Sequence, residues 1–348
     1  MRMSASGFAM HAAWPARVKP SALRLAFLTS TLIAGLSATS RAEAATFIVN
    51  NTNDSGAGSL RQAIVDSNAL GGTNAIDFSV VGTINLLSAL PNITSTLTVD
   101  GSTAPGFAGT PVIFLNGGSV QPVNVQQNGV TIENLVISGG AVPGGQGVTV
   151  GNGTLLIAGP NTYSGGTTLT GGLLTVGSAT VGVPGSITSS AIGTGLLTFD
   201  GGTLAAGGNF TIANAAAINS TGGEIGANGH VFTYSGTIAD GAGSPAGRLV
   251  IFSNGPGGQV ILTGDNTYTG GTQLDTGSLG VGNSHALGTG TLTMFPNTTL
   301  QFMAGGLNLP NNIVFGNLLL GNFDPTFDTQ GFTDTLSGVI SSLSLIHI

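Results

Sequence analysis

The chain of 348 residues has no cysteine and very few charged side chains, which make up 6% of the sequence. Five of its seven basic residues lie in the first 44 positions. The rest of the chain holds Arg61 and Arg248 against 13 acidic residues, that is 14 less Glu43, so its formal charge is 2 − 13 = −11. Because nucleic-acid binding needs a basic surface, this composition excludes it.

The absence of cysteine has two interpretations, and both stay open. An exported chain that crosses a membrane unfolded would be blocked by a disulfide, so export favours a cysteine-free sequence. A stable β-helix can equally do without disulfides. In either case, thiolate metal centres are excluded.

Glycine is abundant, with 59 residues, and 41% of the chain is hydrophobic. That hydrophobic content is enough to bury a core, which excludes a disordered chain. The glycines have no three-residue period, so collagen is also excluded. Helix-forming residues are scarce among Thr, Gly and Val, and this favours an all-β fold.

An internal repeat is the main feature of the sequence. Residues 153–177 read GTLLIAGPNTYSGGTTLTGGLLTVG, and residues 258–282 read GQVILTGDNTYTGGTQLDTGSLGVG. They align without a gap, 258 − 153 = 105 positions apart, which is the signature of an internal repeat. Its most distinctive residues are Asn161, Thr162, Tyr163, Gly165, Gly166 and Thr167, which recur as Asn266, Thr267, Tyr268, Gly270, Gly271 and Thr272.

Each copy predicts three short strands separated by turns, which together make about one coil of a solenoid. Gly-Gly pairs allow positive φ angles at the corners between strands. We expect Asn161 to stack on equivalent side chains at a corner and Tyr163 to cover the edge of a strand. Both residues are interpreted as packing elements rather than as ligands.

The repeat resembles the passenger-associated transport repeat, also called the autotransporter-associated β-strand repeat. Its usual form is GxLxLxGxNTYxGGTxLxxGxLxVG. Gln273 and Asp275 alter only variable positions, whereas Gly280 replaces a usual polar residue. The resemblance implies a right-handed parallel β-helix on a secreted bacterial surface protein, and it implies no activity.

Residues 1–44 are typical of a secretory signal peptide. A basic segment precedes an apolar run over 25–36, and Ala42-Glu43-Ala44 has the small-x-small pattern of a cleavage site near Ala44. The apolar run is too short for an ordinary membrane-spanning helix. At the other end, residues 342–348 break the repeat pattern, and we expect them to be a truncated or non-native tail.

Residues 45–150 predict an N-terminal cap followed by the first coils. Ser59 offers a helix N-cap with Gln62 three positions on, a capping-box arrangement. The segment 51–64 resembles the NTNDSGxGSLRxAI motif at the start of many bacterial secreted β-helix proteins. Asp54-Ser55-Gly56 also resembles a serine-protease loop, but the cap explains it better. The helix face contains Leu60, Ala63, Ile64 and Ser67.

Residues 151–341 predict a continuing β-helix that carries the two repeat copies. Beyond the copies, Ala191-Ile192-Gly193-Thr194-Gly195 corresponds to 286–290, and Ser235-Gly236-Thr237-Ile238 corresponds to 337–340. The offsets are 95 and 102 rather than 105, so insertions fall in loops. An earlier segment, 129–137, predicts a coil with a turn at Glu133-Asn134 and four inward side chains: Val130, Ile132, Leu135 and Ile137.

No catalytic, cofactor or metal site is predicted. A glycosidase needs two adjacent carboxylates, and no adjacent acidic pair marks a cleft. Metal sites need clustered ligands, but the histidines at 230 and 285 are isolated. The acidic residues are scattered, at Asp77, Asp100, Glu133, Asp200, Glu224 and Asp240, and the densest group is Asp324, Asp328 and Asp334.

The sequence therefore predicts a non-enzymatic stalk. By the transport-repeat resemblance, it would be the passenger of an autotransporter-like protein at the cell surface or outer membrane of a Gram-negative bacterium. The partners implied are the export machinery and a C-terminal translocator barrel beyond these residues, without nucleic acid or cofactor. An adhesin that binds glycans or neighbouring cells is the alternative, and a β-helix polysaccharide-degrading enzyme ranks third.

Overall fold

The structure is a computed structural model that describes residues 44–342, without 119, 121, 128, 139–146, 152–153, 242–246 and 317–323. These residues belong to one compact unit. Apart from residue 44, the predicted signal peptide lies outside the described residues. The predicted tail lies outside them from residue 343 onwards.

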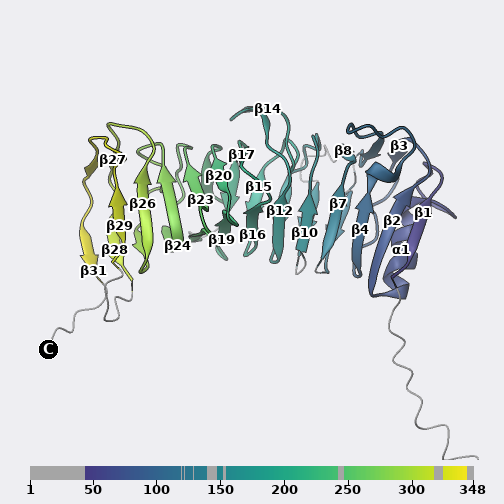
Figure 1. Cartoon of the computed structure of the whole chain (residues 1–348), viewed down its shortest axis with the longest axis horizontal. Helices are drawn as coiled ribbons and strands as arrows, with labels where there is room; N and C mark the ends of the chain where they lie inside the picture. Colours follow the sequence, from purple (N-terminus) through teal and green to yellow (C-terminus); the bar gives the residue numbers. More distant parts are fainter. Residues whose placement is uncertain are drawn as a thin grey trace, which may run out of the picture. The chain divides into compact units, whose positions relative to one another are not determined.

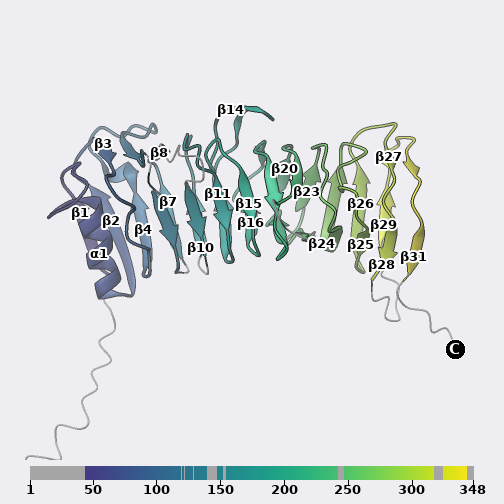
Figure 2. The ribbon, with the colours of Figure 1, turned by 180° about the vertical axis from the view of Figure 1, so that it is seen from behind.

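The described residues form an all-β solenoid of about 11 turns, whose strands stack in parallel from coil to coil (Figure 1, Figure 2). Every strand pair among them is parallel except one hairpin, β13 (Val181–Val183) with β14 (Ser186–Ser189). The predicted parallel β-helix with a short capping helix is thereby confirmed. Parallel strands follow from the coil itself, because each strand pairs with the strand one turn further along the chain.

One ladder, called the long ladder here, runs through nearly all coils. It contains β1 (Thr46–Val49), β2 (Thr73–Phe78), β4 (Thr96–Asp100), β7 (Val130–Glu133), β10 (Thr154–Ile157), β12 (Leu173–Val176), β16 (Thr203–Ala206), β19 (Gly223–Gly226), β22 (Leu249–Phe252), the first part of β24 (Thr272–Val281), β25 (Leu292–Met294), β28 (Ile313–Phe315) and β31 (Ile340–Ser342).

The other faces of the coils are shorter ladders. The short ladder contains β17 (Phe210–Ile212), β20 (Val231–Tyr234), β23 (Gln259–Leu262), the second part of β24, β26 (Thr298–Phe302) and β29 (Thr326–Asp328). The six-stranded sheet contains β6 (Val123–Val125), β9 (Val148–Val150), β11 (Thr167–Leu169), β15 (Leu197–Phe199), β18 (Ala216–Ile218) and β21 (Ile238–Asp240). Two small sheets complete the coils: β3 (Gly82–Asn85), β5 (Ile113–Asn116) and β8 (Val136–Ser138), and β27 (Asn308–Leu309) with β30 (Thr335–Leu336).

Alternating side chains along each strand fill one continuous core. In the coil over 129–137, the four side chains predicted to point inward are all buried. The predicted turn is present as well, because Asn134 adopts a φ of 57° between β7 and β8. Each fully buried aliphatic side chain contributes about 1.5–3 kcal/mol to stability. The core is therefore built from many small, local contributions.

Coil length is far from constant. Thr154 pairs with Leu173, so that coil advances 173 − 154 = 19 positions along the chain. Thr98 pairs with Thr131, so the coil there advances 131 − 98 = 33 positions. Because the paired strands keep their register, loops absorb the difference. The longest insertions therefore leave the stacked strands undisturbed.

The capping helix α1 (Leu60–Leu70) packs against β1 and β2 at the N-terminal end of the solenoid (Figure 1). Its buried residues are the four predicted from the sequence. Ser59 caps it by accepting a hydrogen bond from the Gln62 backbone N–H at 3.2 Å. The predicted capping box is only half formed, because the Gln62 side chain donates to Asp66 at 2.8 Å instead.

Candidate functional site

The two repeat copies adopt the same coil. In the first copy, β10 pairs with β12, and Thr154 lies opposite Leu173, at an offset of 173 − 154 = 19 positions. In the second copy, β23 pairs with the second part of β24, and Gln259 lies opposite Ser278, at the same offset of 278 − 259 = 19. Each repeat therefore closes one complete turn, as the sequence predicts.

Asn161 and Asn266 tie the coil before each copy to the coil after it. Asn161 Oδ1 accepts from the backbone N–H of Ile137 at 2.9 Å, and its Nδ2 donates to the Ala191 carbonyl at 2.8 Å. Asn266 repeats the pattern with the residues at 238 and 286, at 2.8 and 2.7 Å. Both side chains are buried. The expected stacking on equivalent side chains is therefore wrong, because the partners are backbone groups of neighbouring coils.

Two further buried asparagines, which sequence reasoning missed, make only part of this pattern: their side chains bind the coil before them, and their Oδ1 atoms have no hydrogen-bond partner among the described residues. Asn214 donates from Nδ2 to the carbonyls of Gly193 and Gly195 in the coil before it, at 3.0 and 2.9 Å. Asn311 donates to the equivalent carbonyls at 288 and 290, at 3.0 and 2.7 Å. Neither asparagine lies in an NTY motif. The sequence feature that marks these two asparagines is a Ser-Gly pair one coil later, at 235–236 for Asn214 and at 337–338 for Asn311. The glycine of each pair packs closely against the backbone carbonyl of its asparagine.

We call Asn161, Asn214, Asn266 and Asn311 the asparagine series. Its members occur in every second coil, and the coils between them supply the carbonyl groups that they bind. A buried amide can satisfy backbone groups that the turn leaves without a sheet partner. The series thus supplies hydrogen bonds where the strands stop at a corner.

Tyr163 and Tyr268 lie inside the core. Their hydroxyls hydrogen-bond the hydroxyls of Thr167 and Thr272 at 2.8 and 2.6 Å. Both tyrosines are fully buried, so the expectation that Tyr163 covers a strand edge is wrong. Burial raises the pKa of both phenols well above the usual value, and the threonine hydrogen bond only partly opposes it. They therefore remain neutral packing groups.

The second glycine of each Gly-Gly pair is required by the turn. Gly166 has a φ of 82°, and a Cβ there would lie 2.5 Å from the Leu196 carbonyl oxygen. Gly271 repeats this with a φ of 81°. The glycines at 165 and 270 are half-buried, and the threonine side chains at 162 and 267 are exposed. The other repeated residues are thus used inside the solenoid, which leaves little of the motif free to bind a ligand.

The N-terminal motif forms a second built feature, which we call the clasp. Arg61 Nη2 lies 2.7 Å from Asp54 Oδ1, and these side chains are only 17% and 12% exposed. Arg61 also donates to the carbonyls of Ser88 and Ala89, and Asp54 accepts from the Leu87 N–H. The hydrogen bond from Arg61 outweighs burial and lowers the pKa of Asp54 below its usual value.

The clasp accounts for the segment that resembles a protease loop. The Asp54 carboxylate is engaged with Arg61 and with a backbone N–H, so it orients no histidine. Asn51 and Gly58 shape the same loop: Asn51 donates to the Ala57 carbonyl, and a Cβ at Gly58 would overlap the neighbouring asparagine side chain at 50. The motif therefore fastens the loop before α1 to the coil that follows.

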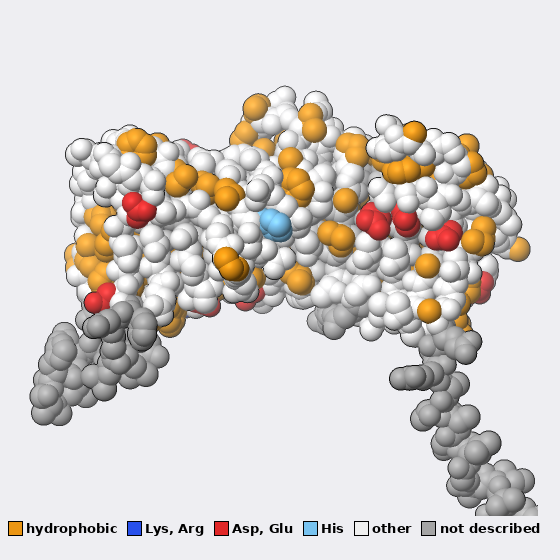
Figure 3. All heavy atoms as spheres, viewed as in Figure 1, with side chains coloured by type: hydrophobic (Ala, Val, Ile, Leu, Met, Phe, Trp, Pro, Cys, Tyr) orange, Lys and Arg blue, Asp and Glu red, His pale blue; other side chains and the backbone are white. Residues whose placement is uncertain are grey.

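The acidic residues that look scattered in the sequence are partly brought together. Asp77, Asp100 and Glu133 occupy equivalent positions on β2, β4 and β7. Figure 3 shows a short row of acidic side chains over the N-terminal coils. Burial raises the pKa of Asp100, but hydrogen bonds from Asn134 and Ser102 outweigh it, and the pKa lies below its usual value. Asp100 is thereby committed to local partners.

The remaining polar candidates are dispersed over the described residues. Asp328 accepts from Gln301, and Asp334 accepts from the backbone N–H at 307. His285 Nδ1 lies 2.6 Å from Asp265 Oδ1 in an exposed pair. Within the described part of the chain, no group of three His, Cys, Asp or Glu side chains is placed to hold a metal ion.

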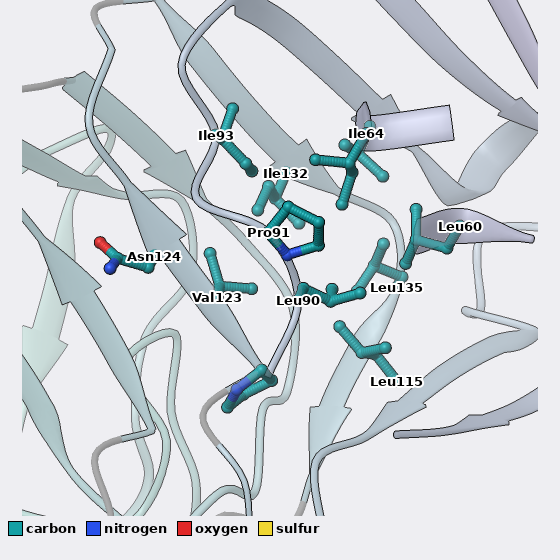
Figure 4. Close-up of a pocket in the computed structure, with 12 residues that line it drawn as sticks. Leu60, Ile64, Leu90, Pro91, Ile93, Leu115, Val123, Asn124, Ile132 and Leu135 are labelled. Atoms are coloured by element: carbon teal, nitrogen blue, oxygen red, sulfur yellow. The ribbon is translucent and has the colours of Figure 1, made fainter. Parts of the chain in front are cut away.

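A small apolar cavity lies between α1 and the first coils (Figure 4). Its volume of ≈ 20 Å³ is close to that of a single water molecule, far below the few hundred Å³ of a ligand site. The lining includes Leu60 and Ile64 of the helix and Ile132 of β7. We interpret it as imperfect packing where a helix meets stacked strands.

Comparison with protein-family models, curated proteins and solved structures gives no match. Within the described residues, no helix combines the length and the apolar character needed to cross a membrane.

Proposed function

We propose that this chain is the structural stalk of an autotransporter-like surface protein, which assists its own export and display outside a Gram-negative cell. The observation that carries the proposal is that both transport-like repeats form complete coils with the same register and the same buried asparagine contacts. In this role the work is mechanical, and the chain needs no active site.

Coil-by-coil folding is the proposed source of directional movement. In a solenoid, each unit contacts only its neighbours, so stability is added one coil at a time. A coil that folds outside the membrane buries apolar side chains, and every second coil, which carries a member of the asparagine series, adds side-chain hydrogen bonds to a neighbouring coil. Each such step opposes backward sliding of the unfolded chain.

The test is a display experiment in a Gram-negative host. The full chain, with an epitope inserted directly after residue 44, is fused to a heterologous translocator barrel, and surface epitope is measured by antibody binding to intact cells. We expect deletion of residues 153–177 to reduce display severalfold. The matched control deletes residues 224–249, which make one complete coil outside both repeats, since Glu224 pairs with Val250, and which contain no member of the asparagine series. Unchanged display after the first deletion would contradict the proposal.

An equal loss of surface display in the two deletions would mean that export depends on the number of coils and not on the repeat motif. That result would keep the stalk and remove the special role of the transport-like units. A loss confined to the deletion of 153–177 supports the full proposal.

Adhesion is a second candidate because the six-stranded sheet carries two half-buried threonines in register. Thr168 on β11 lies opposite Thr198 on β15, about 4.8 Å along the solenoid, whereas Thr149 on β9 continues the register but is buried. Such a pair suits repeated hydroxyl groups of a neutral glycan. A glycan array probed with the full chain tests it, and the absence of any neutral-glycan signal would argue against adhesion.

A further inference from the structure

The hairpin β13–β14 is an insertion that the coil does not need. In the first repeat, Gly177 and Ala191 are 14 positions apart, whereas the equivalent Gly282 and Ala286 in the second repeat are 4 apart. The additional positions form the hairpin, which projects from the stacked coils (Figure 1). Since the second repeat closes without this insertion, coil closure does not explain it.

The sequence specifies the hairpin closely. Pro184-Gly185 forms its turn, and Gly185 has a φ of 81°, as a type II turn requires. Gly182 has a φ of 114°, and a Cβ there would lie 2.4 Å from the Ser186 carbonyl oxygen. An irregular loop would not require these glycines, so the insertion is a specific secondary-structure element.

The base of the hairpin is fastened to the solenoid. The Thr180 N–H donates to the Thr211 carbonyl at 2.9 Å, and its hydroxyl donates to Ser190 Oγ at 3.1 Å. The same hydroxyl accepts from the Ala213 N–H at 3.1 Å. The hairpin is therefore held in one orientation, which lowers the entropy cost of binding through it.

The hairpin exposes apolar side chains that cover nothing on this chain. Val181 and Val183 are 58% and 62% exposed. Pro184 at the turn is also exposed. Figure 3 shows hydrophobic side chains on this projection and no charged ones.

The surroundings of the hairpin are almost free of charge. Asp200 is the only charged residue between Glu133 and Glu224, although the chain beyond residue 44 has a formal charge of 2 − 13 = −11. A nucleic acid or a charged peptide finds no complementary group here. Two copies of this chain repel each other elsewhere, but they can meet at this uncharged surface, and each offers the same valines.

We propose that β13–β14 is a self-association element, through which a second copy of this chain docks side by side. The hairpin spans only residues 181–189, fewer than the roughly 20–30 residues that each partner contributes to a standard interface, so the contact is weak and concentration-dependent. Lateral contact between neighbouring copies goes beyond the proposed stalk function and does not depend on it.

The first test is the mass of the purified full chain in sedimentation equilibrium from about 10 µM to about 1 mM, a range suited to a small interface. We expect the average mass to rise towards that of a dimer. Val181→Lys with Val183→Lys should raise the apparent dissociation constant at least about tenfold. The matched control, Val65→Lys with Leu87→Lys, adds the same charge at 43% and 82% exposed sites and should leave it unchanged.

A strictly monomeric wild-type chain would overturn the proposal, and so would equal weakening by both lysine pairs. Binding of wild-type monomers to neutral phosphatidylcholine vesicles, lost in the hairpin variant, would also overturn it in favour of a lipid surface.

A second test does not rely on the lysine variants folding. Because the chain has no cysteine, a single Val183→Cys can form disulfides only between copies. Under mild oxidation, its covalent dimer should form at least about tenfold faster than that of the exposed control Val65→Cys. Equal rates would overturn the proposal.

Discussion

The two repeat copies have the same sequence motif, the same coil and the same buried contacts, yet they lie on different ladders. In the first copy, β10 and β12 belong to the long ladder and β11 to the six-stranded sheet. In the second copy, β23 and the second part of β24 belong to the short ladder, and the first part of β24 takes the place of β11 in the long ladder. The motif therefore encodes a turn, and it does not encode which face of the solenoid the turn starts from.

The length of chain in each coil explains this shift. Following the register from Thr154 through Leu173, Thr203 and Glu224 reaches Val250, so four coils advance 250 − 154 = 96 positions. The repeat period is 258 − 153 = 105 positions, which is longer, and the second copy therefore starts one strand later. Outward side chains of the two copies then lie on different ladders, which disfavours a binding surface built by repetition of the motif.

The largest loss of stability is expected when the asparagine contacts of each copy are removed. Asn161→Ala leaves the Ile137 N–H and the Ala191 carbonyl unpaired in the interior, and Asn266→Ala does the same to the equivalent groups at 238 and 286 in the second copy. We expect each variant to lose about 2–5 kcal/mol of local stability. Hydrogen exchange at the amides of Ile137 and Ile238 measures it, with exposed Asn53→Ala as control. A clear difference between the two copies would contradict their equivalence.

The clasp lies outside both copies, and its contribution to stability depends on pH, so it can be compared with the repeats in acid. Arg61→Ala should cost about 2–3 kcal/mol, because it leaves Asp54 and two carbonyls without a charged donor. The pKa of folded Asp54 lies below its unfolded value, so the clasp contributes fully above about pH 4–5 and loses its contribution as pH falls through the folded pKa.

The asparagine and tyrosine contacts of the repeats do not ionise in this acid range. Hydrogen exchange from pH 7 to pH 3 should therefore show α1 loosening before the repeats. Simultaneous loosening of all coils would contradict this order. Asp54→Asn should remove most of the difference between α1 and the repeats.

A smaller effect is expected for the tyrosines. Tyr163→Phe and Tyr268→Phe each remove one buried hydroxyl and leave a threonine hydroxyl with one partner fewer. We expect about 1–2 kcal/mol for each, equal within error, and additive in the double variant because the copies are four coils apart. Urea unfolding followed by circular dichroism measures it. Strong non-additivity would mean that the coils between the copies couple them.

The smallest effect concerns a difference between the copies. Asp265 of the second copy forms a surface pair with His285, which lies just beyond that copy; the equivalent residues of the first copy and the segment after it are Pro160 and Ser190. Both side chains of the pair are more than half exposed, so solvent screens it. His285→Ala should change stability by less than about 0.5 kcal/mol, in the same urea assay and with Asp265→Ala as its partner variant. A loss above about 1 kcal/mol would show a structural role.

Local pattern in the sequence was sufficient to predict much of this fold. The NTYxGGT copies predicted complete coils, the alternation over 129–137 predicted four inward side chains, and Ser59 predicted the start of α1. These features depend on residues close in the chain, where strand period, turn chemistry and capping act directly.

Only the tertiary structure decided which coils face one another, and with them the partners of each buried side chain. The structure places two more asparagines, at 214 and 311, in the asparagine series and buries Tyr163 in the core. It also brings the acidic residues at 77, 100 and 133 into register on neighbouring strands. The shift of the second copy to another ladder and the projection of the uncharged hairpin were decided in the same way. The physical reason is that loops of very different length set which strands of successive coils pair with each other. A local sequence pattern does not contain the total length of these loops, so it cannot predict the pairing.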